Sequence, residues 1–137
     1  MEPVDYRILA EFRYQIRTFL RFSEQEAKAS GLQPQQHQLL LALKGLPSGV
    51  PPTISSLASR LHLQHHTVVG LADRLCKQGY LIRKGVDGDR RMVHLVITRS
   101  GHTVLRQLSI IHRRELQSAV PLLLKTLKKL IDEKRNS

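Results

Sequence analysis

The sequence predicts a mainly helical domain of the α+β type, with one β-hairpin. Most of the chain has apolar residues at the three- and four-residue spacings of amphipathic helices. Residues 53–79 have the length of two short helices, and residues 81–98 alternate like two strands around a turn. Two short helices followed by a hairpin form a winged helix-turn-helix. We therefore expect this fold class, with long helices at both ends of the chain.

Length and composition set the outer limits of the protein. With 137 residues, of which 41% are hydrophobic, the chain can build one compact domain with a core. No run approaches the roughly 18 consecutive apolar residues of a membrane-spanning helix, and the first five residues lack the features of a signal peptide. We therefore expect a soluble, cytoplasmic protein. The single cysteine, Cys76, excludes an intramolecular disulfide and a cysteine-based zinc cluster.

Enzyme motifs are missing from the sequence. It has no nucleophile elbow, phosphate-binding loop, paired metal motif or clustered carboxylates. His62 and His66 are four positions apart, but they straddle an expected turn and lack an acidic partner for a metal site. We expect no catalysis, no cofactor and no metal.

The first half of the chain predicts two helices and a loop. A long first helix is expected over residues 5–30, ended by Gly31. Its repeating apolar residues are Ile8, Leu9, Phe12, Ile16, Phe19 and Leu20. Pro34 suits the first turn of a second, mostly buried helix through Leu43. The glycine- and proline-rich residues 45–52 form a loop.

Residues 53–79 predict a helix-turn-helix. Thr53 is the expected N-cap of a third helix, and His62 with Leu63 forms the turn. The fourth helix is expected over residues 64–78 and ends at Gly79. The apolar faces of the two helices consist of Ile54, Leu57, Ala58 and Leu61, and of Val68, Leu71, Ala72 and Leu75. The polar face of the fourth helix consists of Gln64, His65, His66, Thr67, Gly70, Asp73 and Arg74.

Residues 81–98 predict a basic hairpin. Val93, Leu95 and Ile97 alternate with Met92, His94 and Val96, as a strand with one inward face requires. Asp87 and Gly88 supply the turn, because aspartate tolerates left-handed backbone angles and glycine has no Cβ. Arg90 and Arg91 follow. We favour a DNA-contacting wing over an ordinary solvated hairpin, because the arginines come directly after a candidate recognition helix.

The last part of the chain predicts two more helices. Thr98 is the expected N-cap of a fifth helix that runs to about Leu116, and Pro121 opens a sixth. The sixth helix has an apolar stripe of Leu123, Leu124, Leu127, Leu130 and Ile131 beside Lys125, Lys128 and Lys129. We expect the first and sixth helices to form a homodimer interface; the alternative is that they fold back on their own core.

Positive charge is concentrated in the middle of the chain. Residues 60–106 contain nine lysines and arginines against three acidic residues, within a formal net charge of +11 for the whole chain. Five of the seven histidines lie in the same block: His62, His65, His66, His94 and His102. Such a patch attracts polyphosphate. A basic solubility surface and contact with an anionic membrane surface are the alternatives.

The order of elements, together with three motifs, resembles the MarR family of bacterial transcriptional regulators over nearly the whole chain. The sharpest motif is the wing sequence Asp89-Arg90-Arg91, followed by alternating apolar residues and then Thr98 and Gly101. The other two are Thr67-Val68 in the recognition helix, and Asp73-Arg74-Leu75 with Gly79.

The resemblance implies a homodimer that binds double-stranded DNA, with residues 1–50 and 99–137 forming the dimerisation region and residues 53–98 the DNA-binding region of a single domain. One wing arginine would enter the minor groove, and the other is a candidate partner of Asp89. Asp87, Gly88 and Asp89 would then shape the turn. The implied DNA-contacting residues are Gln64, His65, His66, Thr67, Val69, Gly70, Arg74, Arg90 and Arg91. Arg74 is expected either to touch phosphate or to brace the wing through Asp73.

Two of these positions depart from the family pattern. Val69 is commonly serine in the family, and Gly70 often carries a basic or polar side chain. These changes reduce hydrogen-bond readout of bases. Val69 suits a thymine methyl group, and Gly70 suits a close approach of the helix to the DNA backbone.

The resemblance also implies a small aromatic or phenolic effector, bound in a cleft between the dimerisation and reading lobes. The candidate lining is Phe12, Tyr14, Phe19, Phe22, His37 and Leu41. The alternative is that this aromatic stripe belongs to an interface or the core. We expect Cys76 to be a half-buried inert thiol and not a redox sensor, because only Arg74 or Lys77 is an obvious positive neighbour.

Two other binding functions compete with that of a dimeric repressor that binds a near-palindromic operator and is released by an effector. One is a nucleoid- or RNA-associated winged helix that binds by charge without sequence readout. The other is a winged helix that serves protein assembly. Steep salt dependence without sequence preference would favour the first, and absence of DNA binding the second.

Overall fold

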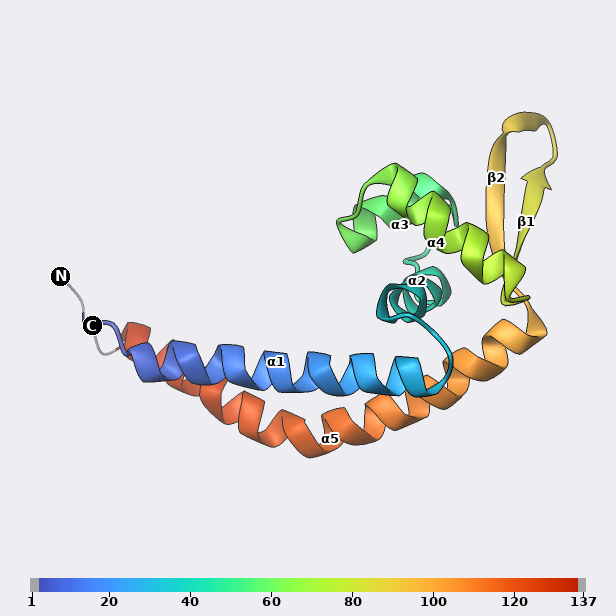
Figure 1. The fold of residues 1–137 in the computed structure, drawn as a ribbon. Helices are drawn as coiled ribbons and strands as arrows, with labels where there is room; N and C mark the ends of the chain where they lie inside the picture. Colours follow the sequence, from blue (N-terminus) through green and yellow to red (C-terminus); the bar gives the residue numbers. More distant parts are fainter. Residues whose placement is uncertain (1–2, 136–137) are drawn as a thin grey trace. The chain divides into compact units, whose positions relative to one another are not determined.

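The computed structural model describes residues 3–135, apart from the side chains of Arg90 and of residues 133–135. The helices are α1 (Tyr6–Ala29), α2 (Pro34–Lys44), α3 (Ile54–Leu61), α4 (His65–Lys77) and α5 (Arg99–Arg135). The strands are β1 (Leu81–Val86) and β2 (Asp89–Ile97), which pair antiparallel (Figure 1). This confirms the mainly helical winged helix-turn-helix that the sequence predicts.

The chain divides into two compact units. Residues up to Glu26 and from Ser109 onward form one, which we call the helical unit, and Ala27–Leu108 form the other, which we call the winged unit. The winged unit therefore contains α2, α3, α4, the hairpin and the first residues of α5. None of the described helices is long and apolar enough to cross a bilayer.

The expected break between a fifth and a sixth helix is wrong. A single helix, α5, runs from Arg99 to Arg135 with Pro121 inside it. Proline removes one backbone donor and crowds the carbonyl four residues earlier, which costs a helix about 3 kcal/mol but does not forbid it. Half-buried leucines follow the proline along the helix, namely Leu123, Leu127 and Leu130, and apolar packing of this kind can offset such a cost.

The winged unit encloses the main hydrophobic core. Every element of the unit contributes to it, and the sequence correctly predicts the buried face of α4. The buried apolar residues are Ala27, Leu32, Leu39, Leu40, Leu43, Leu57, Val68, Leu71, Ala72, Leu75, Leu81, Leu95, Val104, Leu105 and Leu108. Leu41 on α2 lies outside this core and is 50% exposed.

Three of the predicted helix ends are confirmed. The Thr53 hydroxyl accepts a hydrogen bond from the Ser56 backbone N–H at 3.2 Å, so Thr53 caps α3. His62 takes left-handed backbone angles with φ of 53°, which ends α3 at the expected turn. The Thr98 hydroxyl accepts from the Gly101 backbone N–H at 3.1 Å and caps α5.

The start of α5 is tied to the base of the hairpin. The hydroxyls of Thr98 and Ser100 both donate to the Gly79 carbonyl, at 2.6 and 2.9 Å. The Thr98 backbone N–H donates to the Tyr80 carbonyl at 3.1 Å. Gly101 lies against the same carbonyl, and a Cβ atom there would stand 2.3 Å from the Tyr80 oxygen. Only glycine fits this contact.

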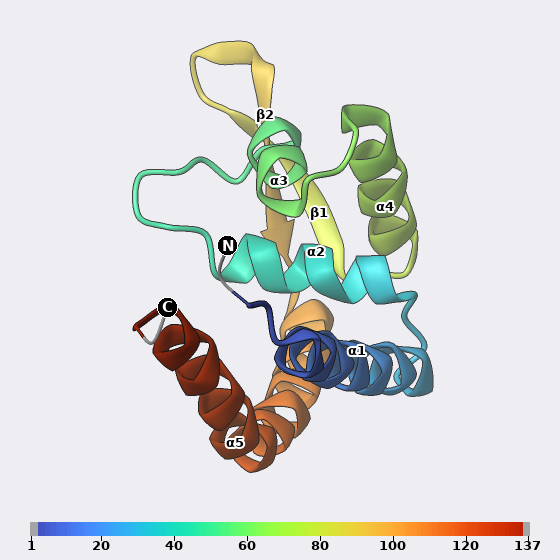
Figure 2. The same ribbon diagram turned by 90° about the vertical axis from the view of Figure 1, so that its left-hand side faces the viewer.

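The hairpin turns at Asp87 and Gly88, as predicted, but only Gly88 takes a positive φ, of 84°. Figure 2 shows the turn projecting away from α3 and α4. The expectation that Val93 faces the core is wrong, because this side chain is 39% exposed while Leu95 is 2% exposed. The core ends at Leu95, and the strand continues beyond it.

The helical unit pairs α1 with the later part of α5. The edges of the Phe19 and Phe22 rings meet the His112 ring, with centroids 6.0 and 5.6 Å away. The His112 Nε2 atom lies 2.7 Å from the Ser23 hydroxyl. Further along, the Gln15 side-chain amide donates to the Thr126 hydroxyl at 2.9 Å. Aromatic and polar contacts together fix how the two helices pack.

Candidate nucleic-acid interface

The first turns of α4 present the predicted reading residues. Gln64 is the N-cap residue, His65 and His66 are exposed, and Thr67 is half-buried. Val68 points into the core, so it anchors the turn that carries these residues. A helix held from beneath, with polar side chains at its N-terminal end, has the form that enters a DNA major groove.

Two further candidates on α4 occupy different surroundings. Val69 and Gly70 are half-buried, and a Cβ atom on Gly70 would meet nothing within 4 Å. The fold therefore does not require glycine at position 70. The predicted reason for glycine at position 70 is a close approach of α4 to the DNA backbone. Arg74, two turns from the helix start, is exposed.

The hairpin tip holds the candidate wing residues. The Arg91 side chain is exposed, and its backbone N–H donates to the Asp89 carboxylate at 2.9 Å. Asp89 therefore contacts the backbone of the strand after the turn, and a structural role for it stays a prediction. The Arg90 side chain lies outside the described part of the structure.

A hollow of about 450 Å³ brings the start of α3, the start of α4 and the hairpin together. It unites two of the predicted contact residues, His65 and Arg91, and adds polar groups that the sequence did not single out. Its lining is Pro51, Thr53, Ile54, Ser55, His65, Asp89, Arg91, Met92 and Val93. The sequence identifies Thr53 only as a helix cap. Residues that cap a helix start also lie where anions bind.

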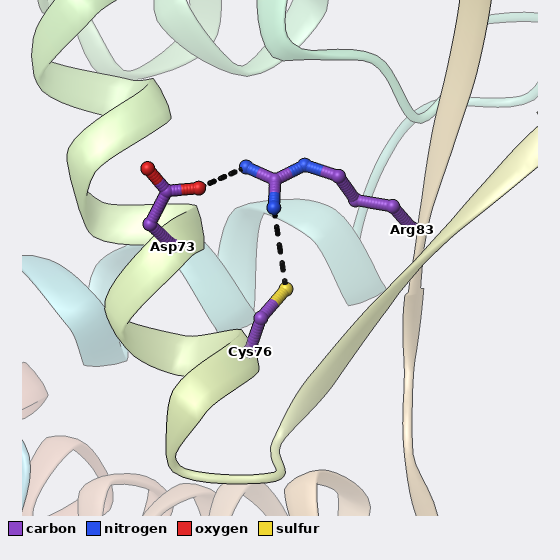
Figure 3. Close-up of polar contacts among 3 residues, drawn as sticks. All are labelled: Asp73, Cys76 and Arg83. Carbon is purple, nitrogen blue, oxygen red and sulfur yellow. Dashed lines mark hydrogen bonds and ion pairs between the residues drawn. The ribbon is translucent and has the colours of Figure 1, made fainter.

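An ion pair joins α4 to β1 through Asp73, which the sequence predicts as a candidate brace for the wing, although its partner is Arg83 and not the expected Arg74. The guanidinium of Arg83 donates to the Asp73 carboxylate and lies 3.9 Å from the Cys76 sulfur (Figure 3). The positive neighbour of Cys76 is therefore Arg83, not the expected Arg74 or Lys77. Cys76 is half-buried, as predicted. Within the described residues, no cluster of histidine, cysteine and acidic side chains suits a metal ion.

The residues expected to line an effector cleft fall in both units. Phe12, Phe19 and Phe22 are half-buried in the helical unit, and Tyr14 is exposed there. His37 is buried and Leu41 half-exposed in the winged unit. The aromatic contacts of Phe19 and Phe22 with His112 give these two rings a packing role within their own unit. The cleft itself stays a prediction.

Comparison with known proteins agrees with this geometry. A family model described as the MarR family matches residues 30–92. The transcriptional repressor MprA of Escherichia coli, from strains K12 and O157:H7, is 32% identical over 81 residues. This match covers 58% of the chain and 45% of MprA, so it spans less than half the length of these curated relatives.

Solved structures are similar over nearly the whole chain. A mutant of Staphylococcus aureus MepR bound to an oligodeoxyribonucleotide has a TM-score of 0.70 and 19% identity, with 95% of this chain and 98% of that chain covered. A MarR family protein from Bacillus stearothermophilus has a TM-score of 0.70 and 19% identity, with 97% and 99% covered. A transcriptional regulator from Thermotoga maritima has a TM-score of 0.60 and 26% identity, with 96% of each covered. The winged unit, its sequence motifs and these folds are therefore similar to those of the MarR family, whose model matches residues 30–92.

Proposed function

We propose that the protein is a dimeric transcriptional repressor that binds a near-palindromic DNA operator and is released by a small effector. The observation that carries this proposal is the hollow in the winged unit, where the start of α4 and the basic hairpin meet. A rigid helix start beside a projecting basic strand pair provides a base-reading element and a backbone-contacting element together. The MprA relatives are transcriptional repressors, which supports the same proposal.

The dimer is proposed to form through the helical unit. Exposed apolar side chains lie along both of its helices. Burying them against a second copy would remove this apolar surface from water. On α1 they include Leu9, Ile16 and Leu20, and on α5 they include Leu116, Val120, Leu124 and Ile131. Two copies would present two α4 helices to successive half-sites of a palindrome.

The wing and the recognition helix are expected to fail in different ways when altered. Arg91→Ala should weaken binding to every duplex and lower the salt slope by about one unit, because it removes a contact with the DNA backbone or minor groove. The same is expected of Arg90→Ala. Thr67→Ala or His66→Ala should cost roughly 1 to 3 kcal/mol on the preferred site and relax sequence choice.

The measurement is fluorescence anisotropy on an operator obtained by in vitro selection and on random duplexes, at several salt concentrations. Unchanged affinity and salt slope in both arginine variants would show that the wing is only structural. A wild-type protein with a steep salt slope and no preference for the selected site would instead support the nucleoid- or RNA-associated alternative. No binding to any duplex would favour a role in protein assembly.

We further propose that a hydrophobic aromatic carboxylate acts as the effector and lowers DNA affinity. A coupling of typical size would change the affinity about ten-fold. Because coupling between two ligands is reciprocal, DNA must weaken effector binding by the same factor. Calorimetric titration of a salicylate-like compound, with and without operator DNA, measures this factor. Equal affinities in the two titrations would remove the proposed allosteric link.

A further inference from the structure

Arg83 on β1 spans one turn of α4. One terminal nitrogen of its guanidinium donates to Asp73, and the other faces the Cys76 sulfur (Figure 3). Asp73 and Cys76 are three positions apart and therefore lie on the same face of the helix. A single side chain of the hairpin is thus held by two positions of the candidate recognition helix.

The position of Arg83 in the hairpin register gives this contact its meaning. Arg83 pairs with Leu95 across the strands, and directly opposed residues project to the same side of a sheet. Leu95 is buried in the core, so Arg83 stands on the side of the hairpin that faces α4. The Leu95 backbone N–H also donates to the Pro52 carbonyl at 2.8 Å, just before α3. The pair Arg83–Leu95 therefore ties the hairpin to α4 and to the chain just before α3.

Beyond the Arg83–Leu95 pair, towards the turn, this side of the hairpin no longer packs against the hydrophobic core. The next pair on the same side is Gly85 with Val93, of which the glycine has no side chain and the valine is 39% exposed. Arg91 lies further towards the turn than this pair. The Asp73–Arg83 contact is consequently placed at the point where the hairpin leaves the core.

We infer that Asp73 and Arg83 form a positioning pair that fixes the hairpin against α4 and thereby places Arg91 for DNA. The inference rests on the proposed DNA-binding function and adds to it residues that act without touching DNA. The Asp73 side chain is 50% exposed and the Arg83 side chain 40%, so the pair contributes little to folding stability. Its effect falls instead on how often the hairpin occupies the position that binding requires.

The expected size of the effect follows from the strength of such a pair. Exposed ion pairs change an equilibrium by about two- to five-fold. When only part of a population is competent to bind, the apparent affinity falls by the competent fraction. Loss of the pair should therefore weaken operator binding about two- to five-fold, while the melting temperature stays nearly the same.

Asp73→Asn is the diagnostic variant, because two explanations give opposite signs for it. It removes a negative charge, so simple attraction to phosphate predicts tighter DNA binding. A positioning role predicts weaker binding. Asp132→Asn, an exposed site in the helical unit, makes the same change of net charge and should not weaken binding. Anisotropy on the selected operator, at one salt concentration, compares the three proteins.

Two further variants test the route through the wing. The charge swap of Asp73→Arg with Arg83→Asp keeps the net charge and can re-form the pair, so affinity should return to within about two-fold of wild type, the lower bound for an exposed pair. In an Arg91→Ala background, Asp73→Asn should have no further effect, because the contact that the pair positions is gone. An undiminished effect in that background would overturn the inference.

The remaining outcomes separate the inference from the proposed function. If wild type binds the operator and Asp73→Asn binds equally or more tightly, the positioning role is wrong and the repressor proposal stands. If wild type selects no DNA sequence at all, both are overturned. A melting temperature that falls in step with affinity would make the pair a simple fold-stabilising contact and would also overturn the positioning role.

Discussion

Replacing Leu124 and Ile131 together by glutamate should convert the proposed dimer into a monomer and weaken operator binding by about 10²- to 10⁴-fold. The two side chains are 51% and 58% exposed on α5, so the change adds charge to the proposed interface without opening the packing between α1 and α5. A monomer engages one half-site and loses the effective concentration that links the two sites. Sedimentation and anisotropy on the same samples should report both losses.

A matched control on the same helix isolates the interface from charge. Ser118→Glu with Lys129→Gln also lowers the net charge by two, and both positions are exposed and polar. This variant should remain dimeric. A wild-type protein that sediments as a monomer at micromolar concentration would rule out the proposed dimer.

Gly101→Ala should destabilise the winged unit by about 3 kcal/mol, close to the upper range for overpacking. The new Cβ atom would stand 2.3 Å from the Tyr80 carbonyl oxygen and 2.8 Å from Ile97 Cγ2. The carbonyl cannot move away cheaply, because it accepts the Thr98 backbone N–H at the hairpin base. The melting temperature should fall by roughly 10 °C.

Gly70→Ala provides the opposite result in the same unit. A Cβ atom at Gly70 meets nothing within 4 Å, and alanine is favoured over glycine inside a helix by about 1 kcal/mol. This variant should raise the melting temperature. Equal melting temperatures for Gly101→Ala and wild type would show that the chain around Tyr80 yields more easily than its hydrogen bonds suggest.

Sequence reasoning succeeds where the signal is local. The caps Thr53 and Thr98, the turn at His62 and the Asp87-Gly88 turn are each specified by a few neighbouring residues, and all four are found. It fails at Pro121, because a proline inside a helix is tolerated or rejected according to tertiary packing that a local pattern does not contain.

Sequence reasoning misses the contact between Arg83 and Asp73 for a related reason. Arg83 meets Asp73 only because the hairpin pairs Arg83 with Leu95, and the position of the turn alone does not give that register. A regular hairpin closing at Asp87 and Gly88 would pair Arg83 with Met92. The sequence therefore predicts α4, the hairpin and a brace through Asp73, but not that the partner of Asp73 is Arg83.

The register of the hairpin steps from Gly85–Val93 to Val86–Asp89, so residues 90–92 lie between two paired rungs. An insertion of this kind separates residues 93–97, whose side chains must alternate between the two faces of the hairpin, from the tip, whose side chains need not. Each side chain from Val93 onward stays on the same side of the hairpin, whatever the length of the inserted segment. Evolution can thus lengthen, shorten or recharge the tip, and so change which DNA the proposed repressor prefers, while the folded core is left as it was.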